Sequence, residues 1–335
     1  MKGMHSKSIL LPGIFFLLLI IGSNTAAKGA AEGITQCVQV IIPSLFPFFF
    51  VSCWFNSKLL GAPLPFFNLL GRLLSLPKGS ESVLLMGLLG GYPVGAKTIT
   101  DAYDSNTISR NTAHILLGYC NNAGPAFIFG ICHILFSSVW IPWVIWSIQI
   151  LSAIITGLLL PKPADGNPSS NYHNDITLIS ALHKSISITA IVCGWIILFK
   201  AILYSLSQIV FLQPILPFLS GFLELSNGSV MLANTFSMSL RFFLFSTFLC
   251  AGGFCVYLQT ASAVATLGTG LYLSGKIIQT AACMLINLPV TYLLFHERPL
   301  PVSILLPLAC ICFGVILLLT VKCRKTCGNY ENNRV

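Results

Sequence analysis

Charged residues are scarce in this sequence. Only 8% of its 335 residues are Asp, Glu, Lys or Arg, whereas a soluble domain carries about 25%. Hydrophobic residues make up 55%, and the mean hydropathy is +0.85. This composition excludes an ordinary soluble protein and predicts an all-α polytopic membrane protein, because helices satisfy their own backbone hydrogen bonds in lipid.

The sequence also lacks the patterns of metal binding and of catalysis. It has 12 cysteines but no CxxC pair, and most of them lie singly in apolar runs, where Cys behaves as a small hydrophobe. No HExxH motif is present, and no spacing joins a nucleophile to a base. We therefore expect no metal, no cofactor and no enzymatic activity.

The net charge of +9 does not indicate a nucleic-acid partner. The basic residues do not cluster on a polar domain; they lie at the ends of apolar runs, as the positive-inside rule expects. We expect the partners to be the lipid bilayer and a small anionic substrate, with no nucleic acid. The sequence leaves a homo-oligomer open.

The apolar runs predict about eight spans and two re-entrant helical hairpins. The first run is either a helix extended to Ala27 or a cleaved signal-like segment, and in both cases residue 28 emerges on the outer side. The further expected spans are 33–56, kinked by its prolines, 108–135, 138–160, 178–207, 236–262, 268–295 and 301–321, with a surface helix at 62–76.

These elements divide the chain into five parts. We expect an N-terminal helix or signal-like segment (1–32), a first membrane repeat (33–160), a cytoplasmic linker (161–176), a second membrane repeat with a final span (177–321) and a basic cytoplasmic tail (322–335).

The stretch GGYPVGAK at 90–97 is full of helix breakers, although it lies in an apolar region. Broken backbone at membrane depth persists only where it packs in protein or lines a wet cavity. We therefore expect a hairpin over 80–104, followed by a span that is interrupted at 121–125. The residues expected to form this tip and this interruption are Gly91, Tyr92, Pro93, Gly95 and Pro125.

The second half repeats this order of parts. GFLELSNG at 221–228 interrupts one apolar piece, and CAGGF at 250–254 interrupts the next. The residues expected at these breaks are Gly221, Gly228, Gly252 and Gly253. On the eight-span topology the two hairpins enter from opposite sides, which predicts an inverted repeat, the architecture of many secondary transporters.

Polar residues at the hairpin tips and interruptions are the candidate substrate ligands. They are Lys97, Asn121, Asn122, Gly124, Glu224, Ser226, Asn227 and Gln259. The half-helix that restarts near Gly124 offers free N–H groups to an anion, and the two asparagines can bind either a ligand or the freed backbone.

Two of the candidates carry charge. Lys97 is either a counter-charge for an anionic substrate or a residue that snorkels to the surface or pairs with Asp101. Glu224 is either a site for a coupling cation or proton, or an exposed loop residue.

Three motifs carry a family resemblance: GGYPVGAK (90–97), CNNAGP (120–125) and GFLELSNG (221–228). Together they resemble the YlbJ/SpoVV-like sporulation integral membrane proteins, over roughly residues 33–320. The resemblance implies a nucleoside-recognition Gate domain, a relationship to concentrative nucleoside transporters, and a location in the bacterial cell membrane or the forespore membrane. It further implies a role in sporulation, in which dipicolinic acid moves across a membrane around the developing spore.

We thus expect a secondary-type transporter of a small anion, with dipicolinic acid favoured by the resemblance. Two other interpretations remain open at this point. One is a nucleoside transporter of the same architecture, since the amides and the carboxylate can also bind ribose and base. The other is a membrane scaffold in spore assembly that transports nothing.

The charge asymmetry of the chain leads to a test of the topology. A reporter fused after Gly166 should show that the linker lies in the cytoplasm, because most basic residues then fall on the inner side. An extracytoplasmic signal would contradict both the topology and the inverted repeat.

Overall fold

The structure, a computed structural model, describes residues 22–59, 64–77, 80–163 and 177–332, together with four isolated residues before them. The described residues are helical and contain no strand. Six of their helices are long and apolar enough to cross a membrane: Ser23–Asn56, Ile141–Leu159, Leu178–Ser207, Met238–Ala263, Tyr272–Phe295 and Val302–Arg324. The interrupted span expected at 108–135 is not among these six helices, and most of the first 22 residues lie outside the described part of the chain. The expected total of eight spans therefore stays a prediction.

The beginning of the chain differs from expectation. Helix α2 (Ser23–Gln36) passes through a π-helical segment (Cys37–Ile41) into α3 (Ile42–Leu59) without a loop. The span expected at 33–56 is therefore part of a longer continuous helix that includes Ser23–Gln36, while the emergence of residue 28 on the outer side stays a prediction. The π-helical segment lies directly before Pro43, which cannot donate a hydrogen bond to the preceding turn.

Close packing explains why the helix continues through this polar stretch. A Cβ added at Gly29 would lie 2.7 Å from the carbonyl oxygen of Lys200, and one at Gly33 would lie 2.9 Å from Cα of Ile197. Both partners belong to α10 (Leu178–Ser207), which packs along α2 and α3. Small residues four positions apart allow such close approach of two helices.

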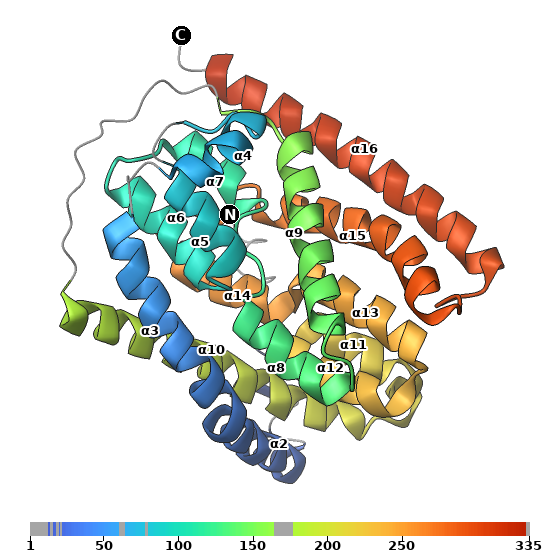
Figure 1. The fold of residues 1–335 in the computed structure, drawn as a ribbon. Helices are drawn as coiled ribbons and strands as arrows, with labels where there is room; N and C mark the ends of the chain where they lie inside the picture. Colours follow the sequence, from blue (N-terminus) through green and yellow to red (C-terminus); the bar gives the residue numbers. More distant parts are fainter. Residues whose placement is uncertain are drawn as a thin grey trace, which may run out of the picture.

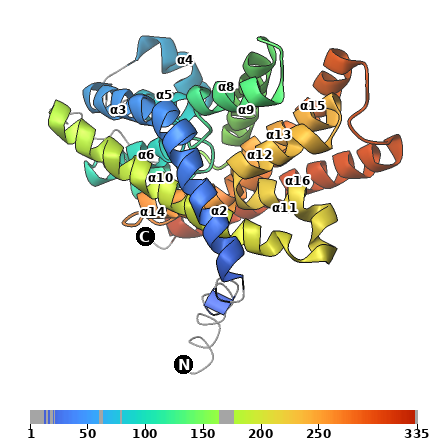
Figure 2. The same ribbon diagram turned by 90° about the horizontal axis from the view of Figure 1, so that it is seen from below.

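The helix from Ser23 to Asn56 is longer than a membrane span requires. Its 34 residues extend over about 50 Å, whereas the hydrocarbon core of a bilayer is about 30 Å thick. Figure 2 shows α2 projecting from the rest of the molecule. Part of α2 therefore lies outside the hydrocarbon core or crosses it at a steep tilt.

The first half contains the expected hairpin and interruption. Helices α5 (Glu81–Leu89) and α6 (Val94–Asp104) form hairpin 1, with residues 90–93 at its tip. Helices α7 (Arg110–Leu117) and α8 (Pro125–Leu135) are separated by the first break, residues 118–124, and α9 (Ile141–Leu159) follows. The tip at Gly91, Tyr92 and Pro93 and the interruption before Pro125 lie where they were expected, whereas Gly95, also expected at the tip, lies inside α6. The expected surface helix is shorter, since α4 covers only Asn68–Leu73 after one 3₁₀ turn.

The second half has the same order of parts. After a 3₁₀ segment (Val210–Ile215), helices α11 (Leu216–Leu223) and α12 (Leu225–Thr235) form hairpin 2, whose turn is the single extended residue Glu224. The second break, Gly252–Gly253, separates α13 (Met238–Ala251) from α14 (Gly253–Ala263), and both glycines have positive φ angles. Gly221 and Gly228, expected at a break, lie inside α11 and α12 instead. The order of parts agrees with an internal repeat, while the inverted relation stays a prediction.

Two long helices complete the chain. Helix α15 (Tyr272–Phe295) is followed by α16 (Val302–Asn332), which continues beyond the expected end at residue 321. Of the linker, residues 164–176 lie outside the described part of the chain, so its cytoplasmic location stays a prediction.

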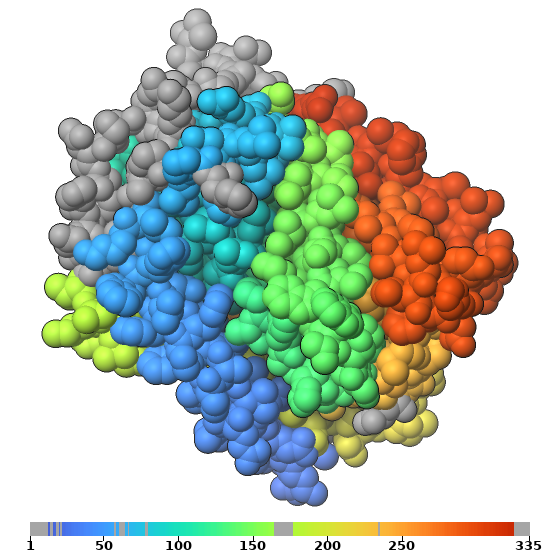
Figure 3. All heavy atoms as spheres, viewed as in Figure 1, coloured from blue at the N-terminus to red at the C-terminus, as the bar shows by residue number. Residues whose placement is uncertain are grey.

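The helices are arranged around α9. In Figure 1 hairpin 1 with α7 lies on one side of α9, and α15 with α16 lies on the other. Figure 3 shows the same division on the surface, where α9 separates the blue first part of the chain from the red last part. Helix α9 packs against α8, α13 and α15, so it links the two halves.

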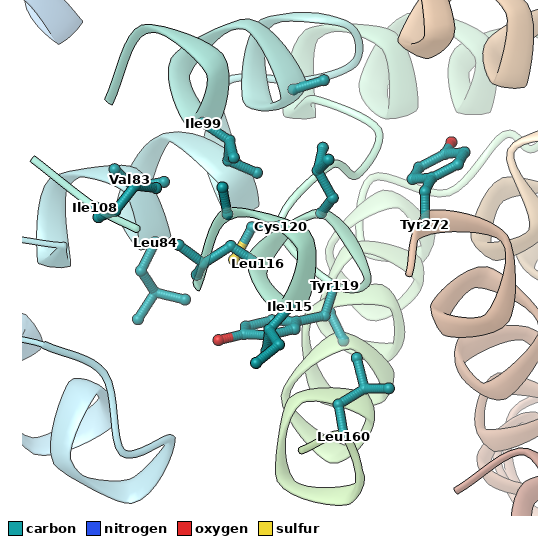
Figure 4. Packing of buried hydrophobic residues seen from close by; sticks show 14 of the residues in the cluster. Val83, Leu84, Ile99, Ile108, Ile115, Leu116, Tyr119, Cys120, Leu160 and Tyr272 are labelled. Carbon is teal, nitrogen blue, oxygen red and sulfur yellow. The ribbon is translucent and has the colours of Figure 1, made fainter. Parts of the chain in front are cut away.

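Hairpin 1 is held by a buried apolar cluster. Leu116 and Cys120, beside the first break, pack with Leu84 and Ile99 of the hairpin arms. In Figure 4 these side chains lie together, and Tyr272 of α15 stands on the opposite side of the break. The hairpin and the break are thus one packed unit, which satisfies the requirement that broken backbone in a membrane be covered by protein.

The tip of hairpin 1 touches the first break at two glycines. Gly91 has φ +75°, and a Cβ added there would lie 3.1 Å from the backbone nitrogen of Gly124. A side chain at Gly91 would therefore meet backbone, which cannot move aside easily, and would also adopt a left-handed conformation that L-residues disfavour.

Gly91→Val should insert in the membrane but lower the stability of the folded protein. Overpacking of this kind costs about 1–3 kcal/mol. We expect a lower midpoint of thermal unfolding in detergent, measured by tryptophan fluorescence. Gly130→Val is the matched control, because a Cβ at Gly130 meets nothing within 4 Å. Equal midpoints for the two variants would contradict the close contact.

Candidate functional site

Both hairpins and both interrupted helices meet at one small space, here called the central cavity. Hairpin 1 contributes Gly91 and Tyr92, hairpin 2 contributes Glu224, the first break contributes Gly124, and α14 contributes Gln259. The cavity measures about 30 Å³, while a single water needs about 10–15 Å³ by the same measure. The site is therefore closed to any ligand larger than a few waters in this conformation.

Asn121 links three elements at the first break. Its side-chain oxygen accepts a hydrogen bond from the backbone N–H of Ala96 in α6 (3.2 Å), and its amide donates to Oγ1 of Thr260 in α14 (2.8 Å). Asn121 therefore ties hairpin 1 to the interrupted helix of the second half. Its role as a substrate ligand stays a prediction.

Asn122 is also saturated by protein groups. Its amide donates to the carbonyl oxygens of Tyr119 (2.7 Å) and Gly87 (3.3 Å). Its oxygen accepts from Nζ of Lys276 (3.1 Å) and from Nε2 of Gln279 (2.8 Å). The side chain thus satisfies freed backbone and, at the same time, orients a buried cation.

Lys276 is that cation, and the sequence analysis missed it. It lies on α15, is 3% exposed, and also donates to Oε1 of Gln279 at 2.9 Å. Its Nζ stands 5.9 Å from the centre of the Tyr272 ring. In the part of the chain that the structure describes, no carboxylate forms an ion pair with Lys276.

A signal for Lys276 was present in the sequence. It is the single charged residue of the expected span 268–295, and an ionisable residue inside a membrane span is a functional candidate by default. Helix breaks do not mark this residue, because α15 is unbroken at Lys276.

Lys97 has a different environment. Its Nζ lies 3.0 Å from a carboxylate oxygen of Asp101, and the other oxygen of Asp101 lies 3.2 Å from Nζ of Lys184 in α10. The Lys97 side chain is 36% exposed and does not line the central cavity. The pairing with Asp101 is therefore present, and contact of Lys97 with a substrate stays a prediction.

Glu224 is buried rather than exposed. It is 4% accessible, and its carboxylate accepts bonds from Ser226 N (3.0 Å), Ser226 Oγ (2.7 Å) and Asn227 N (2.7 Å). The interpretation of Glu224 as an exposed loop residue is wrong, because hairpin 2 folds inward and carries its turn to the central cavity. The second break packs against hairpin 2: a Cβ added at Gly253 would lie 3.0 Å from the carbonyl oxygen of Phe222.

The site residues thus fall into two groups. Gly91, Tyr92, Gly124, Glu224 and Gln259 border the central cavity. Asn121 and Asn122 lie within the first break but do not line the cavity. They bond to Thr260 and Lys276 of the second half. The described residues hold no group of three or more His, Cys, Asp or Glu side chains that could bind a metal ion.

Comparison with known proteins agrees with a membrane role. Over 130 residues the chain is 35% identical to "Sporulation integral membrane protein YlbJ" of Bacillus subtilis (strain 168), a match that covers 36% of this chain and 31% of that protein. No family model matches, and no solved structure matches. This similarity and the six apolar helices show that the chain is an integral membrane protein.

Removing the charge of Lys276 should not destabilise the fold. A buried charge without a counter-ion costs several kcal/mol of desolvation, and Lys276→Met removes it, leaving one acceptor on Gln279 without its donor. We expect an unchanged or higher midpoint of thermal unfolding. Asn122→Leu is the contrast: it removes four hydrogen bonds and should lower stability, because each buried group left unpaired costs about 1–3 kcal/mol. A clear loss of stability in the Lys276→Met variant would contradict this expectation and would assign the lysine a structural role.

Proposed function

We propose that this protein is a secondary-type transporter of a small anion that works in sporulation, with dipicolinic acid as the favoured substrate. The observation that carries the proposal is the meeting of both hairpin tips, the first helix break and the interrupted helix α14 at one small cavity. Interrupted helices that meet at mid-membrane are where transporters bind substrates. A scaffold protein has no need of such a meeting point.

The closed state of the central cavity supports transport by alternating access. A space of about 30 Å³ is too small for a dicarboxylate, so a hairpin must move before a substrate enters. Rigid-body movement or gating of one repeat against the other is the usual motion of secondary transporters.

The charge of the site supports an anionic substrate. Lys276 carries a buried positive charge that no carboxylate in the described chain balances. Its ammonium reaches the first break through Asn122, where α8 begins and presents its positive N-terminal end. Lys97, in contrast, pairs with Asp101, which it shares with Lys184, and its side chain is 36% exposed. We therefore assign Lys276 the leading role in attracting the anion.

A nucleoside is the second candidate. Glu224 and Gln259 line the central cavity, and a carboxylate with a neighbouring amide suits the hydroxyl groups of ribose. The sporulation role rests on the partial similarity to the relative from Bacillus subtilis, and the choice of dipicolinic acid rests on the motif resemblance.

Uptake into proteoliposomes tests these alternatives. Purified protein should take up labelled dipicolinate above empty vesicles, and excess uridine should not compete. Uptake of uridine alone would favour the nucleoside transporter. Uptake of neither compound, by protein that is folded and inserted, would favour the scaffold.

Two charge variants locate the anion in the same assay. Lys276→Gln should weaken dipicolinate binding by about tenfold or more, because a bond to a charged group contributes about 1.5–3 kcal/mol. Lys97→Gln is the matched control and should change it less. A larger loss of binding in Lys97→Gln than in Lys276→Gln would indicate that the substrate binds at Lys97 instead.

A further inference from the structure

Glu224 borders the central cavity, and its neighbours in hairpin 2 border a second, larger hollow. The neighbouring residues Ser220 and Asn227 line a groove of about 640 Å³ between α2, α8, α10 and hairpin 2, here called the polar groove. Glu32, whose side chain is 55% exposed, also lines it. A buried carboxylate with a closed cavity on one side and an open groove on the other is placed to exchange a proton with water.

A chain of hydrogen bonds joins Glu224 to the long helices. Nζ of Lys200 in α10 donates to Oε1 of Gln36 in α2 (2.8 Å), and Nε2 of Gln36 donates to Oγ of Ser226 (3.0 Å). Ser226 Oγ in turn donates to Oε2 of Glu224 (2.7 Å). Every donor points toward the carboxylate, so the chain ends on a charged acceptor when Glu224 is ionised.

Capping of α12 does not account for this arrangement. The carboxylate does accept the N–H groups of Ser226 and Asn227, but shorter side chains such as Ser, Thr, Asp and Asn are the preferred caps. A cap also needs no contact with α2 or α10. Gln36 and Lys200 therefore serve the connection between hairpin 2 and these two helices.

We propose that Glu224 is a proton-binding site, and that its protonation releases hairpin 2 from α2 and α10. A proton from water in the polar groove binds Oε2, and the carboxylate becomes a neutral carboxyl group. Its new O–H is a donor, so Oε2 no longer accepts both Ser226 Oγ–H and Asn227 N–H. Ser226 Oγ still accepts from Gln36 but no longer donates to Oε2, so the chain from Lys200 no longer ends on a charged group; loss of the proton to water restores that end.

Several other titratable groups face Glu224 or its partners. They are Lys200 on α10, Glu32 on α2, Cys37 in the π-helical segment, Tyr92 in hairpin 1 and Cys255 on α14. Thiol, phenol and ammonium groups ordinarily keep one protonation state from acidic to neutral pH. Glu32, which lies 3.8 Å from Lys200, is therefore the group that must be tested beside Glu224.

A proton fits this site better than a metal cation. Metal cations require several oxygen ligands that are free to turn toward the ion. The oxygens of Glu224 already accept three hydrogen bonds, and a proton needs only one lone pair. The release of hairpin 2 does not depend on transport, whereas the further step, that this proton couples to substrate movement, rests on the proposed function.

Hydrogen–deuterium exchange of the full chain in lipid nanodiscs tests the release. Amides of hairpin 2 should exchange at least about tenfold faster at acidic than at neutral pH, after correction for intrinsic exchange, as expected from the loss of one bond to a charged group. Glu224→Gln should show fast exchange in hairpin 2 at both pH values, while exchange in hairpin 1 should match wild type. Glu32→Gln is the matched control and should keep the pH dependence.

Three results would overturn the proposal. They are exchange in wild-type hairpin 2 that does not change with pH, a Glu224→Gln variant that keeps the wild-type pH dependence, and a Glu32→Gln variant that loses it. Because Glu224→Gln also removes a cap, Ser226→Ala serves as a second variant: it cuts the chain but keeps the carboxylate and both N–H bonds. It should raise exchange at neutral pH and retain part of the pH response; slow exchange as in wild type would contradict the connecting role of Ser226.

The coupling step has its own readout. In proteoliposomes, a proton gradient should accelerate substrate uptake by wild type and not by Glu224→Gln. If wild type takes up no substrate, the proposed function fails while the exchange result stands. If both proteins respond equally to the gradient, Glu224 binds a proton but does not couple it.

Discussion

The structure depends on one constraint: every backbone group that leaves a helix inside the membrane must find a partner in protein. Each unsatisfied group in lipid costs several kcal/mol, so the first break cannot exist alone. Asn122 satisfies carbonyl groups of Tyr119 and Gly87, and Asn121 binds Ala96 of hairpin 1 and Thr260 of α14. The breaks and hairpins therefore hold one another in place, and the central cavity lies at their meeting point.

Hydrogen bonds also connect two buried charged residues, Lys276 and Glu224, to the first break and to the long helices. Lys276 is oriented by Asn122, which belongs to the first break. Glu224 is connected through Ser226 and Gln36 to Lys200. One charge thus acts on the break beside hairpin 1, and the other acts on hairpin 2. Under the proposed function, an anion at the first and a proton at the second would provide two separate ways to change the packing of the hairpins.

The sequence predicted the breaks well, because glycine, proline and asparagine in an apolar run leave few alternatives. The tip at residues 90–93, the interruption before Pro125 and the turn at Gly252–Gly253 all agree with the structure. The boundary expected before residue 33 is not seen, because the helix continues through Gly29 and Gly33, which pack against α10. Burial of Glu224 and its link to Lys200 depend in part on contacts between residues more than 160 positions apart in the sequence. No local sequence pattern shows such contacts.

The central claim is that substrate binds where the hairpin tips meet the helix breaks. An electron cryo-microscopy map of the protein in nanodiscs with saturating dipicolinate tests it most directly. The account predicts ligand density between the tip of hairpin 1, the first break and Glu224, together with a cavity larger than the about 30 Å³ of the closed conformation. Ligand density elsewhere, with both hairpins unchanged, would contradict it.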